Sequence, residues 1–363
     1  MKKLSVILAI SLGLAACAEK DSDYARKHRN KTADKAQAEQ TVPAARSAPI
    51  CETPEINICE KSVLPIVADI KKNGLQAALK VLKAELSLPE DFDGSEEAFK
   101  KTITDDMKRI QAQRRLLVLA DKEYRTIYNY DEDVKEATEV VHKLMMDFVK
   151  NEKLDEDGRM GLVGALNTTV VQSVSQTFEL SYQGKDIVTT DMAVACGSDG
   201  QGVMARSLRP GGGPQGVIFI CPGQLLLNAG KTKVERIAGL VMALAHEMTH
   251  QLEFRGFEMD NRVLSCVNAD LADKSAKFIE SKNKETQADI IAFRILNKFL
   301  AQDKELSVQT EKAKAALSWM CHLDDENSES DSSTHLDSKS RLKNFFKLKE
   351  TEDLLGCSKG PRC

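Results

Sequence analysis

The chain lacks the features that mark several large classes of protein. It contains no C-x-x-C pair, so a metal site built from cysteines is disfavoured. Beyond its first residues, no apolar run is long enough to cross a membrane as a helix. The formal net charge of −4 argues against nucleic acid as a partner. These absences leave the amino terminus, the remaining cysteines and a small set of histidines as the informative features.

The first residues have the pattern of an export signal. Lys2 and Lys3 precede an apolar run from Leu4 to Leu14, which is too short to remain as a membrane-spanning helix. Small residues then lead into Cys17, and this arrangement resembles the bacterial lipoprotein box. The resemblance implies a signal peptide over residues 1–16 and a lipid on Cys17. The alternative is an ordinary signal peptide followed by a chance cysteine.

Residues 17–49 are polar and nearly free of large apolar side chains. Such a segment cannot bury enough surface to offset the entropy of ordering it. We therefore expect a flexible tether that lifts a folded part off the membrane. The residue after Cys17 is Ala18 and not aspartate, which by the same resemblance favours the outer membrane, facing the periplasm.

The cysteine count agrees with an exported protein. The chain has nine cysteines, and setting Cys17 aside leaves an even number. An even number in an exported chain indicates disulfides, although eight cysteines allow about 105 pairings. Closeness in sequence and the expected strands suggest four pairs, namely Cys51–Cys59, Cys357–Cys363, Cys196–Cys221 and Cys266–Cys321.

Hydrophobic periodicity divides the rest of the chain into two regions. Residues 50–175 show helical spacing in four segments, at 63–86, 95–128, 131–149 and 155–174, the last begun by a cap at Asp155 or Asp157. Residues 176–363 begin with short strand patterns at 177–182, 187–196, 202–208 and 217–221, followed by helices at 231–254 and 284–300. We expect an α+β fold in which a mainly helical region precedes the domain that carries the chemistry.

That chemistry is indicated by His246-Glu247-Met248-Thr249-His250, an H-E-x-x-H segment in the first of these two helices. On a helix the two histidines share one face and can bind one zinc ion. Glu247 then lies beside the site as a general base. The preceding Gly239–Ala245 is apolar, as in a buried helix, and buried imidazoles need partners.

A catalytic zinc ion needs a third protein ligand, and the second helix offers Glu285-Thr286-Gln287-Ala288-Asp289. An E-x-x-A-D after H-E-x-x-H resembles the gluzincin metallopeptidases of the HtpX and CAAX prenyl protease family, in particular soluble periplasmic lipoproteins. The resemblance implies a zincin-like core with one Zn²⁺ per chain, held by His246, His250 and Glu285. It also implies that Asp289 accepts a hydrogen bond from a ligand histidine. The alternative is that both acidic residues are surface charges.

A third segment, from Ser333 to Leu342, resembles the late part of the same family, where a histidine precedes an arginine. By this resemblance His335 stabilises the oxyanion of the reaction, and Arg341 is a structural or substrate-facing partner. Leu336 stands where the family has proline, so the geometry of this loop is open.

The expected function is a membrane-anchored zinc endopeptidase that acts on envelope proteins. A strand beside the metal helix is expected to bind peptide by strand addition. Two other functions remain open: a zinc-stabilised, chaperone-like lipoprotein that binds clients, and a zinc amidase acting on cell-wall peptides. The helical region 50–175 matches no motif and is a candidate for docking envelope-assembly partners.

Overall fold

A computed structural model describes residues 49–51, 58–59, 65–127, 130–174, 196, 205–208, 215–226, 231–322, 334–357 and 363. The chain divides into two compact units, Met1–Ala45 and Arg46–Cys363, and every described residue belongs to the second. The expected signal peptide, Cys17 and nearly all of the tether therefore lie outside the described residues. So do the two strands expected at 177–182 and 187–196, except for Cys196.

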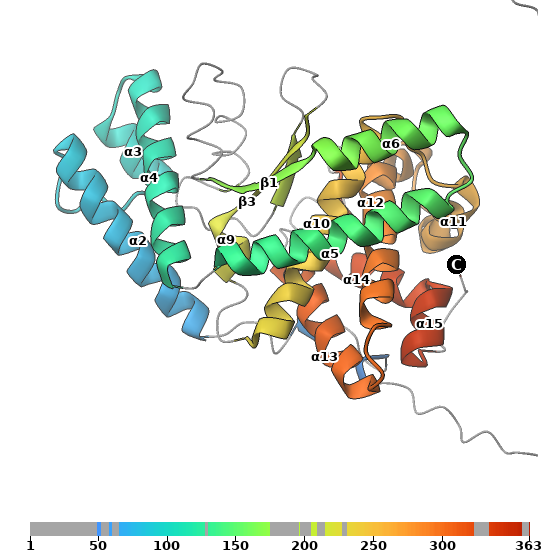
Figure 1. Cartoon of the computed structure of the whole chain (residues 1–363). Coiled ribbons are helices and arrows are strands. Elements are labelled where there is room, and N and C mark those ends of the chain that lie inside the picture. Colours follow the sequence, from blue (N-terminus) through green and yellow to red (C-terminus); the bar gives the residue numbers. More distant parts are fainter. Residues whose placement is uncertain are drawn as a thin grey trace, which may run out of the picture. The chain divides into compact units, whose positions relative to one another are not determined.

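The described part is mainly helical and contains one small mixed sheet, in agreement with the predicted α+β class (Figure 1). The elements before the sheet are η1 (Pro49–Cys51), α2 (Pro65–Leu86), α3 (Glu96–Thr102), α4 (Asp106–Ile127), α5 (Tyr130–Asn151) and α6 (Glu156–Thr168). The sheet consists of β1 (Val170–Ser173), β2 (Ala205–Leu208) and β3 (Val217–Ile220). The elements after it are α9 (Pro222–Leu226), α10 (Lys233–Glu253), α11 (Asn261–Val267), η3 (Asn268–Leu271), α12 (Ala276–Leu300), α13 (Leu306–Leu317), η4 (Ser318–His322), α14 (Ser338–Lys347) and α15 (Lys349–Leu355).

Two of the predicted helices differ from those in the structure. The pattern at 95–128 forms two helices because Ile103 leaves helical geometry, with φ −119° and ψ 98°. The pattern at 155–174 begins at the predicted cap, Asp155, which accepts a hydrogen bond from the Gly158 N–H at 2.7 Å. It ends at Thr168, and the β-branched residues that follow form β1 instead. This segment is a strand because it pairs with β3, which lies far along the chain. The periodicity of a short segment cannot reveal such pairing.

The three strands have the order β1-β3-β2, so β3 is central. β1 runs parallel to β3 with Val170 opposite Val217, and β2 runs antiparallel with Ser207 opposite Ile218. All four side chains of β3 are buried. Within the part of the chain that the structure describes, β2 is therefore an edge strand, as is β1.

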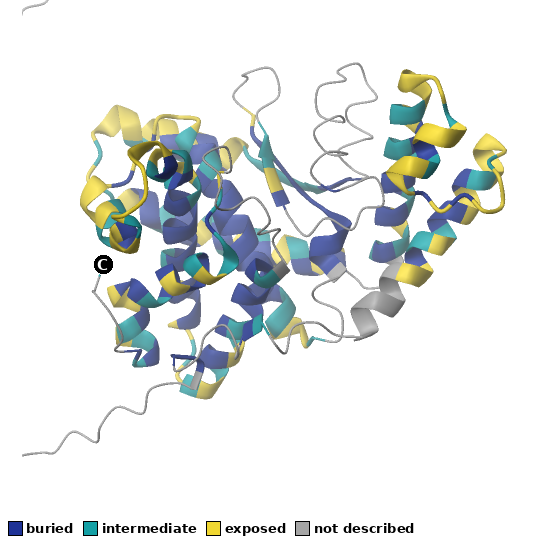
Figure 2. Cartoon of the chain, turned by 180° about the vertical axis from the view of Figure 1, so that it is seen from behind, coloured by how far each residue is buried: buried dark blue, intermediate teal, exposed yellow. Residues whose placement is uncertain are grey.

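The main core surrounds α10, which contacts α5, α12 and α13. The largest hydrophobic cluster includes residues of α5 and α6 together with those of α10 and α12. This cluster thus includes residues on both sides of position 175, where we expected the boundary between the helical region and the domain that carries the H-E-x-x-H segment. Figure 2 shows the buried residues gathered in these interior helices, with exposed residues on outer faces. α2, α3 and α4 pack around a separate, smaller cluster that contains Phe99 and Tyr124.

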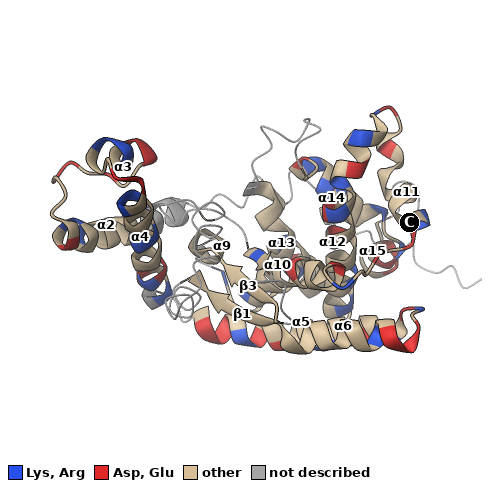
Figure 3. Cartoon of the chain, turned by 90° about the horizontal axis from the view of Figure 1, so that it is seen from above, with Lys and Arg blue, Asp and Glu red and all other residues tan. Residues whose placement is uncertain are grey.

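Acidic and basic residues both occur along the helices, as on α5, which has acidic residues in its first turn and Lys150 in its last (Figure 3). Two ion pairs join α5 to α10. Lys233 lies 2.8 Å from Glu136, and Arg236 lies 2.6 Å from Asp133. Only the second is substantially buried, so it contributes more to the contact than the first.

Four disulfides connect the described cysteines, and three of the four predicted pairs are wrong. Cys196–Cys221 is present as predicted. The other bonds join residues far apart in sequence, at Cys51–Cys357, Cys59–Cys321 and Cys266–Cys363. Proximity along the chain misleads here because segments far apart in sequence meet in space. A disulfide depends on the distance and orientation of the two cysteines in the fold, and not on their separation along the chain.

Candidate metal centre

The H-E-x-x-H segment lies on α10, whose first turn is fixed by a capping box. Thr232 and Glu235 form a reciprocal cap, in which the Thr232 N–H donates to Glu235 at 2.7 Å and the Glu235 N–H donates to the Thr232 hydroxyl at 3.3 Å. The helix is buried without a break from Ile237 to Thr249. His246 is 3% exposed, so its ring sits inside the protein and not on its surface.

The second helix, α12, starts at Ala276, eight residues before the predicted start at Lys284, with Ser275 as its cap. It packs against α10 and brings Glu285 and Asp289 to the two histidines. The four-residue spacing of Glu285 and Asp289 places both carboxylates on one face of the helix.

Three ligand atoms form a nearly equilateral triangle. The Nε2 atoms of His246 and His250 lie 3.2 Å apart. Glu285 Oε2 lies 3.2 Å from the first of these atoms and 3.3 Å from the second. Ligands about 2.0–2.1 Å from a tetrahedral metal ion lie roughly 3.3 Å from one another, so these three atoms are spaced as a zinc site requires.

The outer nitrogen of each histidine contacts a carboxylate. His246 Nδ1 lies 2.9 Å from Asp289 Oδ1, and His250 Nδ1 lies 2.8 Å from Glu253 Oε2. A carboxylate accepts the Nδ1–H and leaves a lone pair at Nε2, which then faces inwards. Two imidazole lone pairs and a carboxylate oxygen that converge in this way need a cation among them, and the side chains present therefore fit a metal ion.

The pKa values of these groups show how strongly the cluster attracts positive charge. Burial lowers the pKa of His246, but hydrogen bonds to Asp289 and Glu285 outweigh burial and raise this pKa to about 9. Burial likewise lowers the pKa of His250, and Glu253 and Glu285 raise it to about 11. Burial raises the pKa of Glu285, yet its contacts with the histidines hold that pKa well below the usual range. Positive charge is thus favoured at the point where the three ligand atoms converge.

Glu247 faces the same cleft but takes no part in the triangle. It is 8% exposed, and burial raises the pKa of its carboxyl above the usual value. The Ser207 backbone N–H, from β2, is a hydrogen-bond partner that acts in the opposite direction. A carboxyl with a raised pKa beside a metal site is suited to accept and return a proton near neutral pH.

His335 reaches the cluster from the segment before α14. Its Nε2 lies 3.1 Å from Glu285 Oε2, its Nδ1 lies 3.0 Å from the Thr334 hydroxyl, and its side chain is 43% exposed. His246, Glu285 and His335 form a group that could hold a metal ion, with one ligand atom from each lying within 4.8 Å of the others. Leu336, in the place of the family proline, is buried, and the loop still carries His335 to the cluster.

Arg341 is buried and is a structural partner. It donates two hydrogen bonds to Asp289, from Nε at 2.8 Å and from Nη2 at 2.7 Å. This ion pair lowers the pKa of Asp289 to about 2, although burial alone would raise it. The guanidinium also lies 5.1 Å from the ring of Trp319, which contacts His246 edge-on at 5.9 Å.

Three residues of the site were missed by the sequence analysis. Glu253 supports His250, Gln287 donates to Glu253 at 2.6 Å, and Trp319 packs against His246. The spacing of Glu253, three residues after His250 on one helix, was a signal that could have revealed it. Gln287 and Trp319 carry no comparable signal, because their roles depend on tertiary packing.

The cluster opens into a cleft of about 490 Å³. One wall is the edge strand β2, through Ala205, Arg206 and Ser207, and the exposed ring of Phe254 also lines the cleft. An unpaired strand edge offers backbone groups to an extended peptide. The sheet edge that lines the cleft is therefore β2.

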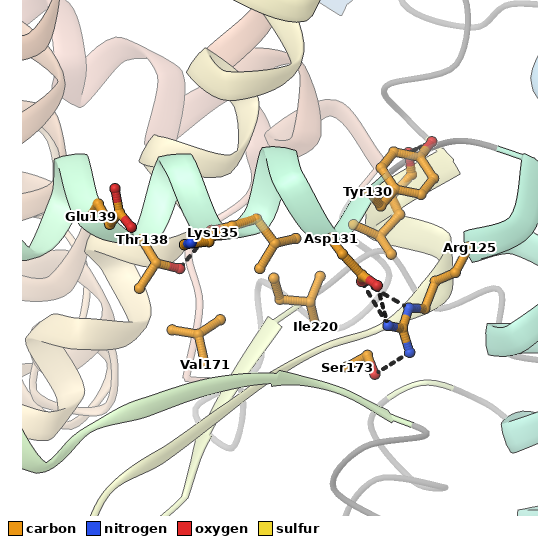
Figure 4. Close-up of a pocket in the computed structure, with 11 residues that line it drawn as sticks. Arg125, Tyr130, Asp131, Lys135, Thr138, Glu139, Val171, Ser173 and Ile220 are labelled. Carbon is orange, nitrogen blue, oxygen red and sulfur yellow. Dashed lines mark hydrogen bonds and ion pairs between the residues drawn. The ribbon is translucent and has the colours of Figure 1, made fainter.

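A second cavity, of about 330 Å³, lies at the opposite edge of the sheet, between α5 and β1 (Figure 4). Its floor includes Val171 and Ile220, and at one end Arg125 donates to Asp131 at 2.6 Å and to the Ser173 hydroxyl at 2.9 Å. None of its lining residues belongs to the metal cleft. No residue singled out from the sequence lines this cavity.

No protein-family model, curated protein or solved structure matches this chain. The described residues include no helix that is long and apolar enough to cross a membrane. The site itself therefore carries the functional argument.

Proposed function

We propose that the chain is a zinc-dependent endopeptidase of the gluzincin type that the sequence resembles, with a zincin-like core formed by α10, α12 and the small sheet. The observation that carries this proposal is the triangle of His246 Nε2, His250 Nε2 and Glu285 Oε2, with separations of 3.2, 3.2 and 3.3 Å. Its spacing suits zinc, and imidazole with carboxylate is a ligand set of catalytic zinc sites.

His246, His250 and Glu285 would hold the ion, one per chain. A zinc ion bound there would supply a water molecule with a pKa of about 7 and a positive charge to polarise a peptide carbonyl. Asp289 and Glu253 would accept the outer N–H of each histidine and so direct the lone pair of its inner nitrogen to the bound ion.

Glu247 acts as the general base. Its buried carboxyl, with a raised pKa, takes a proton from the attacking water and delivers it to the leaving amine. His335 would donate a hydrogen bond to the oxyanion. This role is supported by its Nε2, which lies 3.1 Å from Glu285 Oε2, and by its position in the lining of the cleft. The edge strand β2 holds the substrate in an extended form.

The proposed setting is the bacterial cell envelope, with the protein held by a lipid on Cys17 and facing the periplasm from the outer membrane. Four disulfides agree with an oxidising compartment. The proposed substrates are envelope proteins, and the helical region of residues 50–175 would dock assembly partners.

The proposal is tested with the chain from residue 18 onwards, beside Glu247→Gln. We expect about one zinc ion per chain in both proteins, measured by atomic emission. We expect casein cleavage only in the unsubstituted chain. A loss of about 10²–10⁴ in rate is typical when a general base is removed. Zinc without cleavage in either protein would favour the client-binding alternative, and no zinc in either would remove the basis of the proposal.

A further inference from the structure

A chain of hydrogen bonds runs behind the metal centre and ends on His250. The backbone N–H of Met259 donates to Gln287 Oε1 at 2.6 Å. Gln287 Nε2 donates to Glu253 Oε1 at 2.6 Å. The other oxygen of Glu253 contacts His250 Nδ1 at 2.8 Å. The chain thus joins the segment after α10, α12 and the end of α10.

The direction of every bond follows from the first. A backbone N–H can only donate, so Gln287 must present its oxygen to Met259 and its amide N–H to Glu253. Glu253 therefore accepts from Gln287 with one oxygen, and its second oxygen accepts the N–H of His250. With a metal bound, this arrangement fixes a single tautomer of His250, whose Nε2 lone pair faces the site.

These side chains are held firmly enough to act as a support. Gln287 is 5% exposed, and Glu253 has 12% of its side chain exposed. Gln287 also lies two residues after Glu285 on α12. One helix therefore carries a candidate ligand, Glu285, and a residue that acts through Glu253 on a second ligand, His250. The support of His246 is built differently, because there the carboxylate of Asp289 is held by the charged Arg341.

We propose that Glu253 and Gln287 are positioning residues that set the tautomer and ring orientation of His250. This inference rests on the proposed metal centre. It assigns to each ligand histidine its own supporting carboxylate, one held by an arginine and one held by a glutamine amide.

The test is a matched set of variants of the full chain, with affinity for Zn²⁺ measured by competition with a chromophoric chelator. Glu253→Gln keeps the shape of the side chain, but its single carbonyl oxygen cannot serve both donors. We expect zinc to bind about 10–100-fold more weakly, the usual effect of losing such a support. Gln287→Glu places two carboxylates against each other and is also expected to weaken binding.

The double variant, Glu253→Gln with Gln287→Glu, separates positioning from general damage. In this pair the new glutamine accepts from His250 and donates to the new glutamate, which also accepts from the Met259 N–H. Every donor again meets an acceptor, so we expect the affinity to return to within about threefold of the original. A role in packing alone would give no such recovery, since both side chains would remain altered.

Glu258→Gln is the control, because it removes the same charge from an exposed position close by in sequence. We expect it to leave zinc affinity unchanged. Two results would overturn the inference and leave the metal centre intact. One is unchanged zinc affinity in Glu253→Gln, and the other is a zinc affinity that does not recover in the double variant. Absence of zinc binding in the unsubstituted chain would overturn the metal centre and this inference together.

Discussion

Arg341 donates two hydrogen bonds to Asp289, at 2.7 and 2.8 Å, and both side chains are almost fully buried. The same carboxylate contacts the outer nitrogen of His246 at 2.9 Å. One acidic residue of α12 therefore links a histidine of α10 to an arginine of α14. Its contacts with His246 and Arg341 thus join three helices that contribute residues to the cleft.

Asp289→Asn should destabilise the metal-free protein strongly. The change leaves the buried guanidinium of Arg341 without a counter-charge, and breaking a buried pair in this way typically costs about 3–5 kcal/mol. Urea unfolding with the disulfides intact measures the loss. Asp260→Asn is the matched control, because Asp260 pairs with Arg262 at the surface, where solvent screens the pair and its loss should change stability far less. Equal losses in the two variants would show that the Asp289–Arg341 pair is not a buried structural pair.

His335→Gln should lower the rate of peptide cleavage without releasing zinc. This prediction rests on the proposed peptidase activity, in which His335 donates to the oxyanion. Removing one such donor typically costs about 10²–10³ in kcat. The measurement is steady-state cleavage of a fluorogenic peptide, beside metal content. His142→Gln serves as control. His142 lies on α5, forms a hydrogen bond of 3.2 Å with Asn167, and does not line the cleft. Loss of the metal from the His335 variant would instead identify His335 as a ligand.

Gly216→Ala should destabilise the sheet beside the metal helix. A Cβ at Gly216 would lie 2.2 Å from Gln251 Oε1 and 2.8 Å from the Thr169 hydroxyl. Gln251 is fully buried and donates to the Leu208 carbonyl at 3.1 Å, so it has little freedom to move. Overpacking of this kind typically costs about 1–3 kcal/mol.

The control for this change is Gly161→Ala in α6, where a Cβ would meet nothing within 4 Å. An alanine inside a helix is favoured over glycine by about 0.5–1 kcal/mol, so this variant should be more stable than the original chain. Thermal unfolding of both variants gives opposite shifts. Shifts of the same sign would contradict the close packing between Gly216 and Gln251.

Within each of the two helices the candidate residues could be predicted, because their spacing is local. The four-residue spacing of His246 and His250, and of Glu285 and Asp289, fixes each pair on one helix face. The contact between these two helices depends on residues far apart in sequence. It was expected only from the family resemblance, and not from the spacing of the residues. The wrong disulfide pairs show the same limit, since Cys51 and Cys357 are 306 residues apart in sequence. β1 was missed for this reason too, because its pairing with β3 outweighs a helical pattern in its own residues.

The stability of the chain should also depend on pH through Lys231. Burial lowers the pKa of this lysine to about 8, against an ordinary value of 10.5, and its Nζ lies 2.9 Å from the Ser318 hydroxyl. Between these two pH values the unfolded chain binds more protons at Lys231 than the folded chain does, so the free energy of unfolding rises with pH across that window. Below pH 8 the cost of burying the charge is fully present.

Lys231→Met removes that cost, and we expect the variant to be more stable than the original chain at pH 7. The difference should shrink as pH rises from 8 towards 10.5, where the folded chain carries a neutral Lys231. Urea unfolding of both proteins across this range gives the comparison. Lys233→Met is the control, because Lys233 is exposed and paired with Glu136, which raises its pKa. That variant should gain no stability at pH 7. If the free energy of unfolding of Lys231→Met differed from that of the original chain by the same amount at every pH, burial of the Lys231 charge would not destabilise the protein.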